Sequence, residues 1–198
     1  MTAIVIIDSG GANLASLGFA LQRLGASSVV STEPAVIRAA THVLLPGVGS
    51  AGNTMQRLRA RGLDQLIPQL TQPVLGICLG MQLLFSHSAE EQTACLGVLP
   101  GSVEKLEPAA GRPVPHMGWN TLQIGEADAL LSGISDSDYV YFVHSYCAPT
   151  GSYTLAGTDY GRPFSSVVRH QNFFGAQFHP ERSGPVGARL LANFLACN

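Results

Sequence analysis

One cysteine in this chain of 198 residues stands in a setting that favours nucleophilic chemistry. An apolar run at residues 74–77 predicts a buried strand, and a helical pattern begins directly after Cys78. Glycines two residues before and two residues after Cys78 permit a sharp turn that exposes the thiol. At the start of a helix, free N–H groups favour a thiolate, and the N–H of Leu79 can face a developing oxyanion. The pattern predicts a nucleophile, and the alternative is a small buried cysteine that ends a strand.

A histidine and a glutamate two positions apart form the second candidate group. Pro180 keeps His179 out of the helical region of backbone space, so the side chains of His179 and Glu181 can lie side by side. A carboxylate in that place can orient an imidazole and stabilise its protonated form, while the other ring nitrogen faces a nucleophile. Taken alone, this pair also fits an ordinary polar pair at a surface.

A glycine-rich loop follows another predicted strand. Residues 44–49 read Leu-Leu-Pro-Gly-Val-Gly, and in a parallel sheet this loop lies at the carboxyl edge, where open α/β sheets bind ligands. Its backbone N–H groups can face an anion. Near the Cys78 turn, the loop can supply a second oxyanion donor, and alone it would be an ordinary turn.

The elements that must position these residues follow two patterns. In the first 90 residues, short apolar runs alternate with helical patterns, which is typical of βαβ units and a parallel sheet. Strands are predicted over residues 3–7, 29–30, 42–45 and 74–77, and helices over 13–24, a short segment from Pro34, 53–70 with a break near Gly62, and 79–87.

The second half predicts a succession of strands and one final helix. These strands cover residues 97–103, 118–124, 139–146, 153–158, 165–170 and 173–178, and the helix covers 186–196. Gln171 and Asn172 predict a tight turn between the last two strands. We therefore expect an α/β fold with an open, twisted, mostly parallel sheet flanked by helices, and extra antiparallel strands in the second half.

Composition and charge exclude several classes of protein. Hydrophobic residues make up 46% of the chain, charged residues 12%, and the net charge is −2, which argues against a disordered chain and a nucleic-acid binder. Cys78, Cys95, Cys147 and Cys197 form no C-x-x-C pair, which argues against a zinc ribbon and a dithiol redox motif. We expect no metal site and no cofactor. The first residues predict a strand and no signal peptide, and no apolar run approaches the roughly 20 residues of a membrane span. We expect one cytoplasmic domain over residues 1–198.

Three motifs resemble those of the class I (triad) glutamine amidotransferases, and they occur in that family's order. They are Pro-Gly-Val-Gly at 46–49, Gly-Ile-Cys-Leu-Gly-Met-Gln at 76–82 and His-Pro-Glu at 179–181. Three further segments are similar to the glutaminase subunits of imidazole glycerol phosphate synthases, of histidine biosynthesis. These are Gly-Gly-Ala-Asn at 10–13, Pro-His-Met-Gly-Trp-Asn at 115–120 and Tyr-Phe-Val-His-Ser-Tyr at 141–146. The resemblance implies a flavodoxin-like amidotransferase fold.

The resemblance also implies a role for each matching residue. Cys78 would attack the side-chain carbonyl of glutamine, His179 would transfer protons, and Glu181 would orient His179. The oxyanion hole would be formed by the backbone of Gly47, Val48 and Leu79. The residues that would hold glutamine are Gly49, Gln82, His144, Ser145 and Tyr146. A γ-glutamyl thioester would form, ammonia would leave, and water would release glutamate.

The same resemblance implies a partner. Ammonia would pass to a cyclase subunit, a (β/α)₈ barrel, which makes imidazole glycerol phosphate and aminoimidazole carboxamide ribotide; the two subunits would form a heterodimer. The residues expected at this interface are Asn13, Met117, Trp119, Asn120 and Arg182. Many relatives carry lysine where this chain has Arg182, so the contact geometry is expected to differ.

Other functions also fit parts of the sequence. Another glutaminase of the family, such as the pyridoxal phosphate synthase or anthranilate synthase subunit, would share the triad but not the pattern at residues 115–120. A peptidase or γ-glutamyl hydrolase would use the same triad without a partner. A non-catalytic flavodoxin-like binding module would carry Cys78 as a structural residue that resists alkylation.

Overall fold

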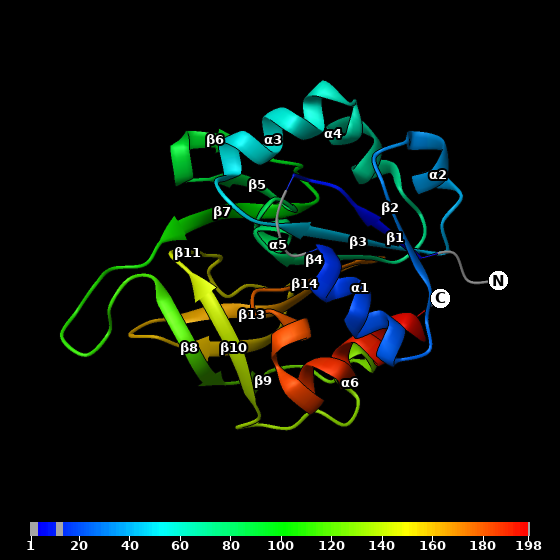
Figure 1. Cartoon of the computed structure of the whole chain (residues 1–198). Coiled ribbons are helices and arrows are strands. Elements are labelled where there is room, and N and C mark those ends of the chain that lie inside the picture. The colour runs from blue at the N-terminus through cyan, green and yellow to red at the C-terminus, as the bar shows by residue number, and fades with distance from the viewer. Residues whose placement is uncertain (1–3, 11–13, 198) are drawn as a thin grey trace.

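A central eight-stranded sheet organises the computed structural model, which describes residues 4–10 and 14–197 (Figure 1). Five neighbouring strands are parallel: β2 (Ser28–Ser31), β1 (Ile4–Ile7), β3 (His42–Gly47), β4 (Val74–Cys78) and β14 (Phe173–Ala176). Three antiparallel strands extend the sheet beyond β14: β13 (Pro163–His170), β12 (Thr154–Asp159) and β9 (Gln123–Ile124). This arrangement confirms the predicted α/β fold, with its parallel first half and antiparallel extension.

Two smaller sheets accompany the central one. One is an antiparallel ribbon of β8 (His116–Thr121) and β10 (Tyr139–His144). The other contains, in spatial order, β11 (Tyr146–Cys147), β7 (Leu99–Lys105), β5 (Phe85–Ser88) and β6 (Thr93–Ala94).

Helices cover both faces of the central sheet, because its strands carry apolar side chains on both faces. Side chains alternate along β1: Ile4 and Ile6 belong to one apolar core, and Val5 and Ile7 belong to another. The first core also receives α1 (Leu14–Arg23) and α6 (Gly184–Leu195), and the second receives α2 (Pro34–Arg38), α3 (Ala51–Ala60) and α4 (Leu63–Leu66). The remaining helices are α5 (Leu79–Gln82) and the short 3-10 helices η1 (Ile67–Gln69), η2 (Glu90–Gln92), η3 (Ala129–Leu131) and η4 (Pro180–Arg182).

Several predicted boundaries hold and others do not. The predicted helix at 53–70 breaks near Gly62, as expected, where the backbone adopts a left-handed φ of 66°. The predicted turn at Gln171 and Asn172 joins β13 to β14 in an antiparallel pair. The predicted strands at 118–124 and 139–146 are each divided into two. Asn13, at the start of the predicted first helix, lies outside the described residues.

The predicted helix over residues 79–87 is wrong. Helix α5 ends at Gln82, and Phe85–Ser88 form β5, which pairs in parallel with β7. Leu83, Leu84 and Phe85 are fully buried, and an apolar run that is buried on all sides lacks the alternation that separates a strand from a helix. Among the described residues, no helix is long and apolar enough to cross a membrane.

Candidate functional site

Cys78 ends β4 on a strained turn. Its φ of 53° and ψ of −112° place a non-glycine residue in a region that L side chains rarely adopt, which is a feature of functional turns. The turn is packed so closely that glycine is needed on both sides. A Cβ on Gly76 would lie 2.7 Å from the carbonyl oxygen of Gly80, and a Cβ on Gly80 would overlap the carbonyl oxygen of Leu45. Because α5 has only four residues, Cys78 faces the free N–H groups of a single helical turn and not the long helix that the sequence predicted.

His179 and Glu181 lie side by side after β14. The imidazole Nδ1 and the Glu181 Oε1 are 2.9 Å apart, and the His179 and Glu181 side chains are only 8% and 2% exposed. The His179 backbone N–H donates to the carbonyl of Tyr141, and the His179 carbonyl accepts a hydrogen bond from the Ser183 hydroxyl, which fixes the residue between two elements. Burial alone would lower the pKa of His179, but hydrogen bonds to Cys78 and Glu181 outweigh it and raise this pKa to about 10. The imidazole is therefore held as a cation beside the sulfur.

The Cys78 sulfur has two further polar neighbours. Its Sγ lies 3.8 Å from the carbonyl oxygen of Val143, an acceptor, and 3.8 Å from Nε2 of Gln177, a donor. The sequence pattern assigned neither residue a role. Gln177 stands 99 positions from Cys78, and only the pairing of β14 with β4 brings it there, so no local sequence signal identifies it.

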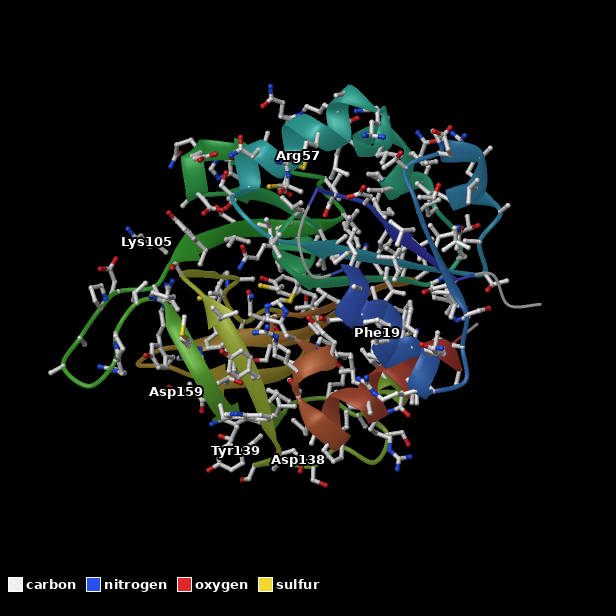
Figure 2. All side chains as sticks on the ribbon, in the orientation of Figure 1. Phe19, Arg57, Lys105, Asp138, Tyr139 and Asp159 are labelled. Atoms are coloured by element: carbon white, nitrogen blue, oxygen red, sulfur yellow. The ribbon has the colours of Figure 1, made fainter. Side chains whose placement is uncertain are left out.

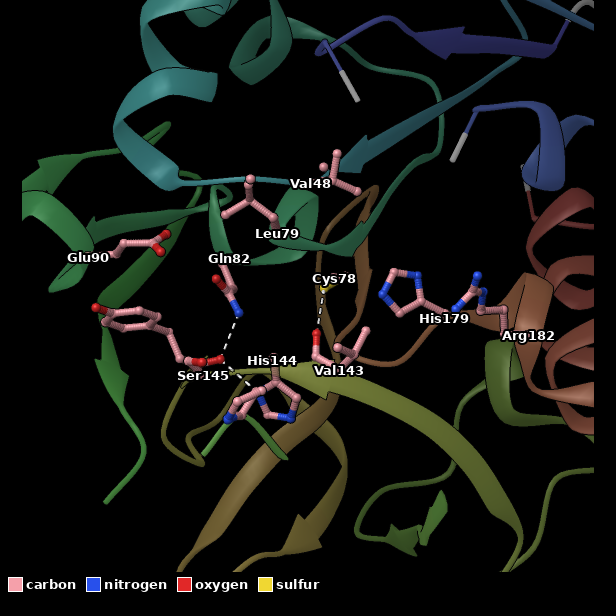
Figure 3. Close-up of a pocket in the computed structure, with 14 residues that line it drawn as sticks. Val48, Cys78, Leu79, Gln82, Glu90, Val143, His144, Ser145, His179 and Arg182 are labelled. Carbon is pink, nitrogen blue, oxygen red and sulfur yellow. Dashed lines mark hydrogen bonds between the residues drawn. The ribbon is translucent and has the colours of Figure 1, made fainter. Parts of the chain in front are cut away.

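A cavity of about 400 Å³ opens over Cys78 (Figure 3). It is lined by Gly47, Val48, Gly49, Cys78, Leu79, Gln82, Glu90, Pro115, Val143, His144, Ser145, Tyr146, His179 and Arg182. The structure therefore brings together every residue predicted for the oxyanion hole and for substrate binding. Glu90, Pro115 and Val143 are the lining residues that were not predicted to belong to the site.

Glu90 contributes a carboxylate to this cavity and holds the loop beside it. Its Oε2 accepts a hydrogen bond of 2.8 Å from the backbone N–H of Ala51, the first residue of α3. The neighbouring Glu91 accepts one from the Ser50 hydroxyl, directly after the Gly47–Gly49 loop. Desolvation raises the pKa of Glu90 despite the opposing hydrogen bond from Ala51, with a further contribution from Glu91. These contacts anchor the end of the glycine-rich loop through η2.

Behind the cavity, two buried histidines form a directed hydrogen-bond chain. His144 Nδ1 lies 2.8 Å from the carbonyl oxygen of Tyr146, so it donates there, and its Nε2 accepts from Nδ1 of His116 at 3.1 Å. Nε2 of His116 in turn accepts from the Asn120 amide. Burial lowers the pKa of His116 to about 4 and that of His144 to about 3, so both rings are neutral at ordinary pH. His144 therefore supports the cavity wall through its ring nitrogens.

The outer face of the β8–β10 ribbon carries exposed apolar side chains. Met117 is 62% exposed and Trp119 is 54% exposed, and the Trp119 ring stands edge-on to Tyr141 at 5.9 Å between centroids. The Arg182 guanidinium lies 5.9 Å from the centroid of the same Tyr141 ring, at the rim of the cavity. Figure 2 shows a further exposed aromatic side chain, Tyr139, on this ribbon. Trp119 and Arg182 thus both lie against Tyr141, and Met117 is on the same face of β8 as Trp119.

Two other predicted interface residues are not placed on this face. Asn120 hydrogen-bonds His116 and the carbonyl of Asp159, on the opposite side of β8 from Trp119. The half-buried amide of Asn120 is therefore used within this chain, by His116 and by the Asp159 carbonyl. Asn13 lies outside the described residues.

Among residues 4–10 and 14–197, no group of three or more His, Cys, Asp or Glu side chains is placed to hold a metal ion. All four cysteines are free thiols. Burial raises the pKa of Cys95 and of Cys147 to about 11 and also raises that of Cys197, while Cys78 alone lines the cavity beside a cationic imidazole.

Comparisons with known proteins agree with this geometry. The family described as glutamine amidotransferase class-I matches residues 5–197. Curated relatives called imidazole glycerol phosphate synthase subunit HisH are 50% identical in Xanthomonas oryzae over 98% of both chains and 48% identical in Vibrio cholerae over 97% of both chains. The relative of that name in Idiomarina loihiensis is 52% identical over 97% of this chain and 96% of its own.

Solved structures show the same fold at low sequence identity. A component of a putative GMP synthase from Thermoplasma acidophilum has a TM-score of 0.76 at 18% identity, covering 99% of this chain and 93% of its own. PurLQS from Thermotoga maritima has a TM-score of 0.71 at 18% identity, covering 98% and 97%. The full-length match to the family and the relatives at about half identity lead to one conclusion: this chain belongs to the class-I glutamine amidotransferases, in the group of imidazole glycerol phosphate synthase HisH subunits.

Proposed function

We propose that this chain hydrolyses glutamine to glutamate and ammonia as the glutaminase subunit of an imidazole glycerol phosphate synthase, in histidine biosynthesis. The observation that carries the proposal is the array of Cys78 and His179 at one wall of the cavity, with the buried Glu181 carboxylate against His179 Nδ1. In this array the nucleophile contacts a cationic imidazole, and the imidazole is oriented by a buried carboxylate, which is the arrangement that acyl transfer requires.

The reaction follows from these contacts in two steps. The Cys78 thiolate attacks the side-chain carbonyl carbon of glutamine, the carbon–nitrogen bond breaks, and His179 gives its Nε2 proton to the departing ammonia. Water then attacks the γ-glutamyl thioester and gives a proton to His179, and the carbon–sulfur bond breaks to restore the thiolate and release glutamate. Glu181 keeps the imidazole in one orientation and stabilises its charge in both steps.

The rest of the cavity supplies recognition. The backbone of Gly47, Val48 and Leu79 forms the oxyanion hole in this proposal, at the edge where the loop after β3 meets the Cys78 turn. The side-chain amide of Gln82 keeps its oxygen for the substrate, because its nitrogen is used by Tyr146 and Gln177.

The remaining lining residues complete the site for glutamine. Gly49, His144, Ser145 and Tyr146 form the wall against which the substrate packs. The Glu90 carboxylate, the one acidic group that lines the cavity among the described residues, attracts the substrate ammonium.

The partner in this proposal is a cyclase subunit with a (β/α)₈ barrel, which takes up the ammonia and forms a heterodimer with this chain. The exposed Met117 and Trp119 beside Arg182 support an interface next to the cavity, since an exposed aromatic cluster with arginine is a common interface core. We also propose that residues 1–198 form one domain, which the family match over 5–197 supports. The cytoplasmic location predicted from the sequence stays a prediction.

The test measures glutamate release from glutamine by the complex of this chain with the cyclase partner and its nucleotide substrate. Cys78→Ala should abolish glutamate release, and ammonium salt should restore synthesis of imidazole glycerol phosphate in the same complex. Cys95→Ala is the matched control, because Cys95 lies away from the cavity, and it should keep full activity. Glutamine hydrolysis by Cys78→Ala at the original rate would refute the proposal.

A further inference from the structure

One buried amide in contact with the catalytic sulfur has no role in the mechanism above. Gln177 follows β14 and is completely buried. Its Oε1 lies 3.0 Å from Nε2 of Gln82, and its own Nε2 lies 3.8 Å from Sγ of Cys78. The carboxamide thus stands between a residue proposed to bind substrate and the atom proposed to react.

The surrounding hydrogen bonds fix which end of the Gln177 amide faces the sulfur. Nε2 of Gln82 lies 2.7 Å from the backbone carbonyl oxygen of Tyr146, which can only accept, and 3.0 Å from one end of the Gln177 amide. The Gln82 amide nitrogen must therefore point there. If the Gln177 amide were reversed, its NH₂ would meet the NH₂ of Gln82, and a buried donor would lose its partner, which is costly. Gln177 consequently presents a donor to Cys78.

The histidine chain behind the cavity ends on the same Tyr146 carbonyl. The Tyr146 carbonyl that receives Gln82 also receives Nδ1 of His144, and His144 is fixed in turn by His116. Because both rings are neutral near neutral pH, His144 keeps its Nδ1 proton on the Tyr146 carbonyl, which accepts from Gln82 as well.

We propose that Gln177 is a catalytic residue whose side-chain amide donates a hydrogen bond to the Cys78 thiolate before attack on glutamine and again when the thioester breaks. The inference rests on the proposed function, since it takes Cys78 as the nucleophile. Another neighbour of the sulfur, the Val143 carbonyl, is an acceptor and cannot donate to a thiolate. Gln177 supplies a neutral donor that, together with cationic His179, shifts the balance toward the thiolate.

The experiment compares two variants that differ by one step along the chain of hydrogen bonds. Gln177→Met removes the donor to the sulfur, and the matched control Gln82→Met removes the neighbouring amide while leaving Gln177 beside Cys78. In the full chain, the rate of iodoacetamide alkylation at Cys78 is followed against pH by mass spectrometry of the Cys78 peptide. Alkylation needs the thiolate but no bound glutamine, so it reports on the sulfur and not on substrate binding.

We expect Gln177→Met to move the midpoint of the alkylation profile upward by about one pH unit, which is the tenfold loss of thiolate expected for one hydrogen bond to a charged group. In the complex with the cyclase partner, kcat should fall by a similar factor. Gln82→Met should raise KM for glutamine; because it removes the donor that orients Gln177 but leaves the Gln177 amide in place, it should shift the alkylation midpoint less than Gln177→Met does. If Gln177→Met does not fold, Gln177→Asn withdraws the same amide from the sulfur and should give the same shift.

An unchanged alkylation midpoint in a folded Gln177 variant would overturn the inference. The proposed function fails in a different way: wild-type Cys78 would then react no faster than Cys95, Cys147 or Cys197. The first result would be seen in the Gln177 variant and the second in the wild-type chain, so the same alkylation measurements distinguish a failure of this inference from a failure of the proposed function.

Discussion

At the residue scale, the charge of Glu181 determines how His179 can act. The pKa of His179 is raised to about 10, against the effect of burial, by hydrogen bonds and charge interactions with Cys78 and Glu181. Glu181→Gln keeps the size of the side chain but removes its charge, so the pKa of His179 should fall. We expect the alkaline limb of the kcat profile to move to lower pH, because the imidazolium that protonates the leaving ammonia is lost earlier.

The measurement is kcat for glutamine hydrolysis by the complex from about pH 6 to about pH 11, a range that includes the titration of His179 near pH 10. His179→Ala provides the comparison: it removes the acid and base altogether and should lower kcat by about 10²–10⁴-fold at every pH. An alkaline limb that stays in place in Glu181→Gln would show that Glu181 does not set the charge of His179.

The same scale shows which site residues a sequence can reveal. Cys78 and the pair of His179 and Glu181 were predicted because each lies in a short local pattern whose geometry follows from nearby glycine or proline. Gln177 and Glu90 were not predicted, because their positions depend on long-range contacts: Gln177 reaches Cys78 across 99 positions, and Glu90 reaches Ala51 across 39. Nothing in the sequence near these two residues records those contacts.

At the scale of elements, the Cys78 turn depends on the close approach of β3, β4 and α5. A Cβ on Gly80 would overlap the Leu45 carbonyl oxygen, which is backbone and cannot move aside alone. We expect Gly80→Ala to separate these elements, lower the free energy of unfolding by at least about 1–3 kcal/mol, the typical cost of overpacking, and abolish glutamine hydrolysis. Urea unfolding and the glutaminase assay measure the two effects.

Gly18→Ala is the matched control for the same chemical change. Gly18 lies within α1, and the nearest atom to an added Cβ is the Ser28 hydroxyl oxygen at 4.0 Å. An alanine there should raise the free energy of unfolding by up to about 1 kcal/mol, because alanine is the better helix former. Equal effects of Gly80→Ala and Gly18→Ala would mean that the turn tolerates a side chain.

The elements also show where sequence patterns stop being informative. Most strands were predicted because β-branched and apolar runs end at glycine or proline. The helix break at Gly62 was predicted because glycine also interrupts helical patterns. The segment after Gln82 was mistaken for helix because Leu83, Leu84 and Phe85 are all buried, so their order shows no preferred face. Its identity as β5 is decided by the partner strand β7, which lies later in the chain.

At the scale of the whole molecule, buried histidines make stability depend on pH in two directions. His116 and His144 have folded pKa values of about 4 and 3, so below about pH 6.5 the unfolded chain binds protons there that the folded chain does not. The free energy of unfolding should therefore fall as the pH drops from 6.5 toward 4. His179 acts oppositely: its stabilising contribution is complete below about pH 6.5 and is lost as the pH rises through about 10.

We expect maximum stability near pH 6.5, with a slope of up to about 1.4 kcal/mol per pH unit for each proton on either side. Urea unfolding at pH 5, 6.5 and 8, each about one to two units apart, measures both limbs. His144→Gln should flatten the acid limb, and His170→Gln, which changes an exposed histidine outside the chain of buried rings, should not. An acid limb that is identical in His144→Gln and in the wild type would contradict this account.

The last prediction concerns how a partner bound at the exposed β8–β10 ribbon would affect the oxyanion loop at Gly47, Val48 and Gly49. A glutaminase that releases ammonia without an acceptor wastes glutamine, so we expect the isolated chain to be poorly active. The loop at Gly47, Val48 and Gly49 offers a local cause, because glycines make a peptide flip inexpensive, and a carbonyl in place of an N–H would remove one oxyanion donor. Loss of one such donor costs about 10²–10³-fold in rate.

The cyclase partner with its nucleotide bound should therefore raise glutaminase activity by at least about 10²–10³-fold, the factor of one restored oxyanion donor. A partner can shift the loop only by its differential affinity for the two loop states, about 3–4 kcal/mol for this factor. Trp119→Ala should weaken the activation while leaving the unfolding transition nearly unchanged, because the indole is 54% exposed and contributes little to the core. The measurement is steady-state glutamate release with and without the partner. If the isolated chain hydrolyses glutamine as fast as the complex, the oxyanion loop is already in its active conformation and partner binding does not change it.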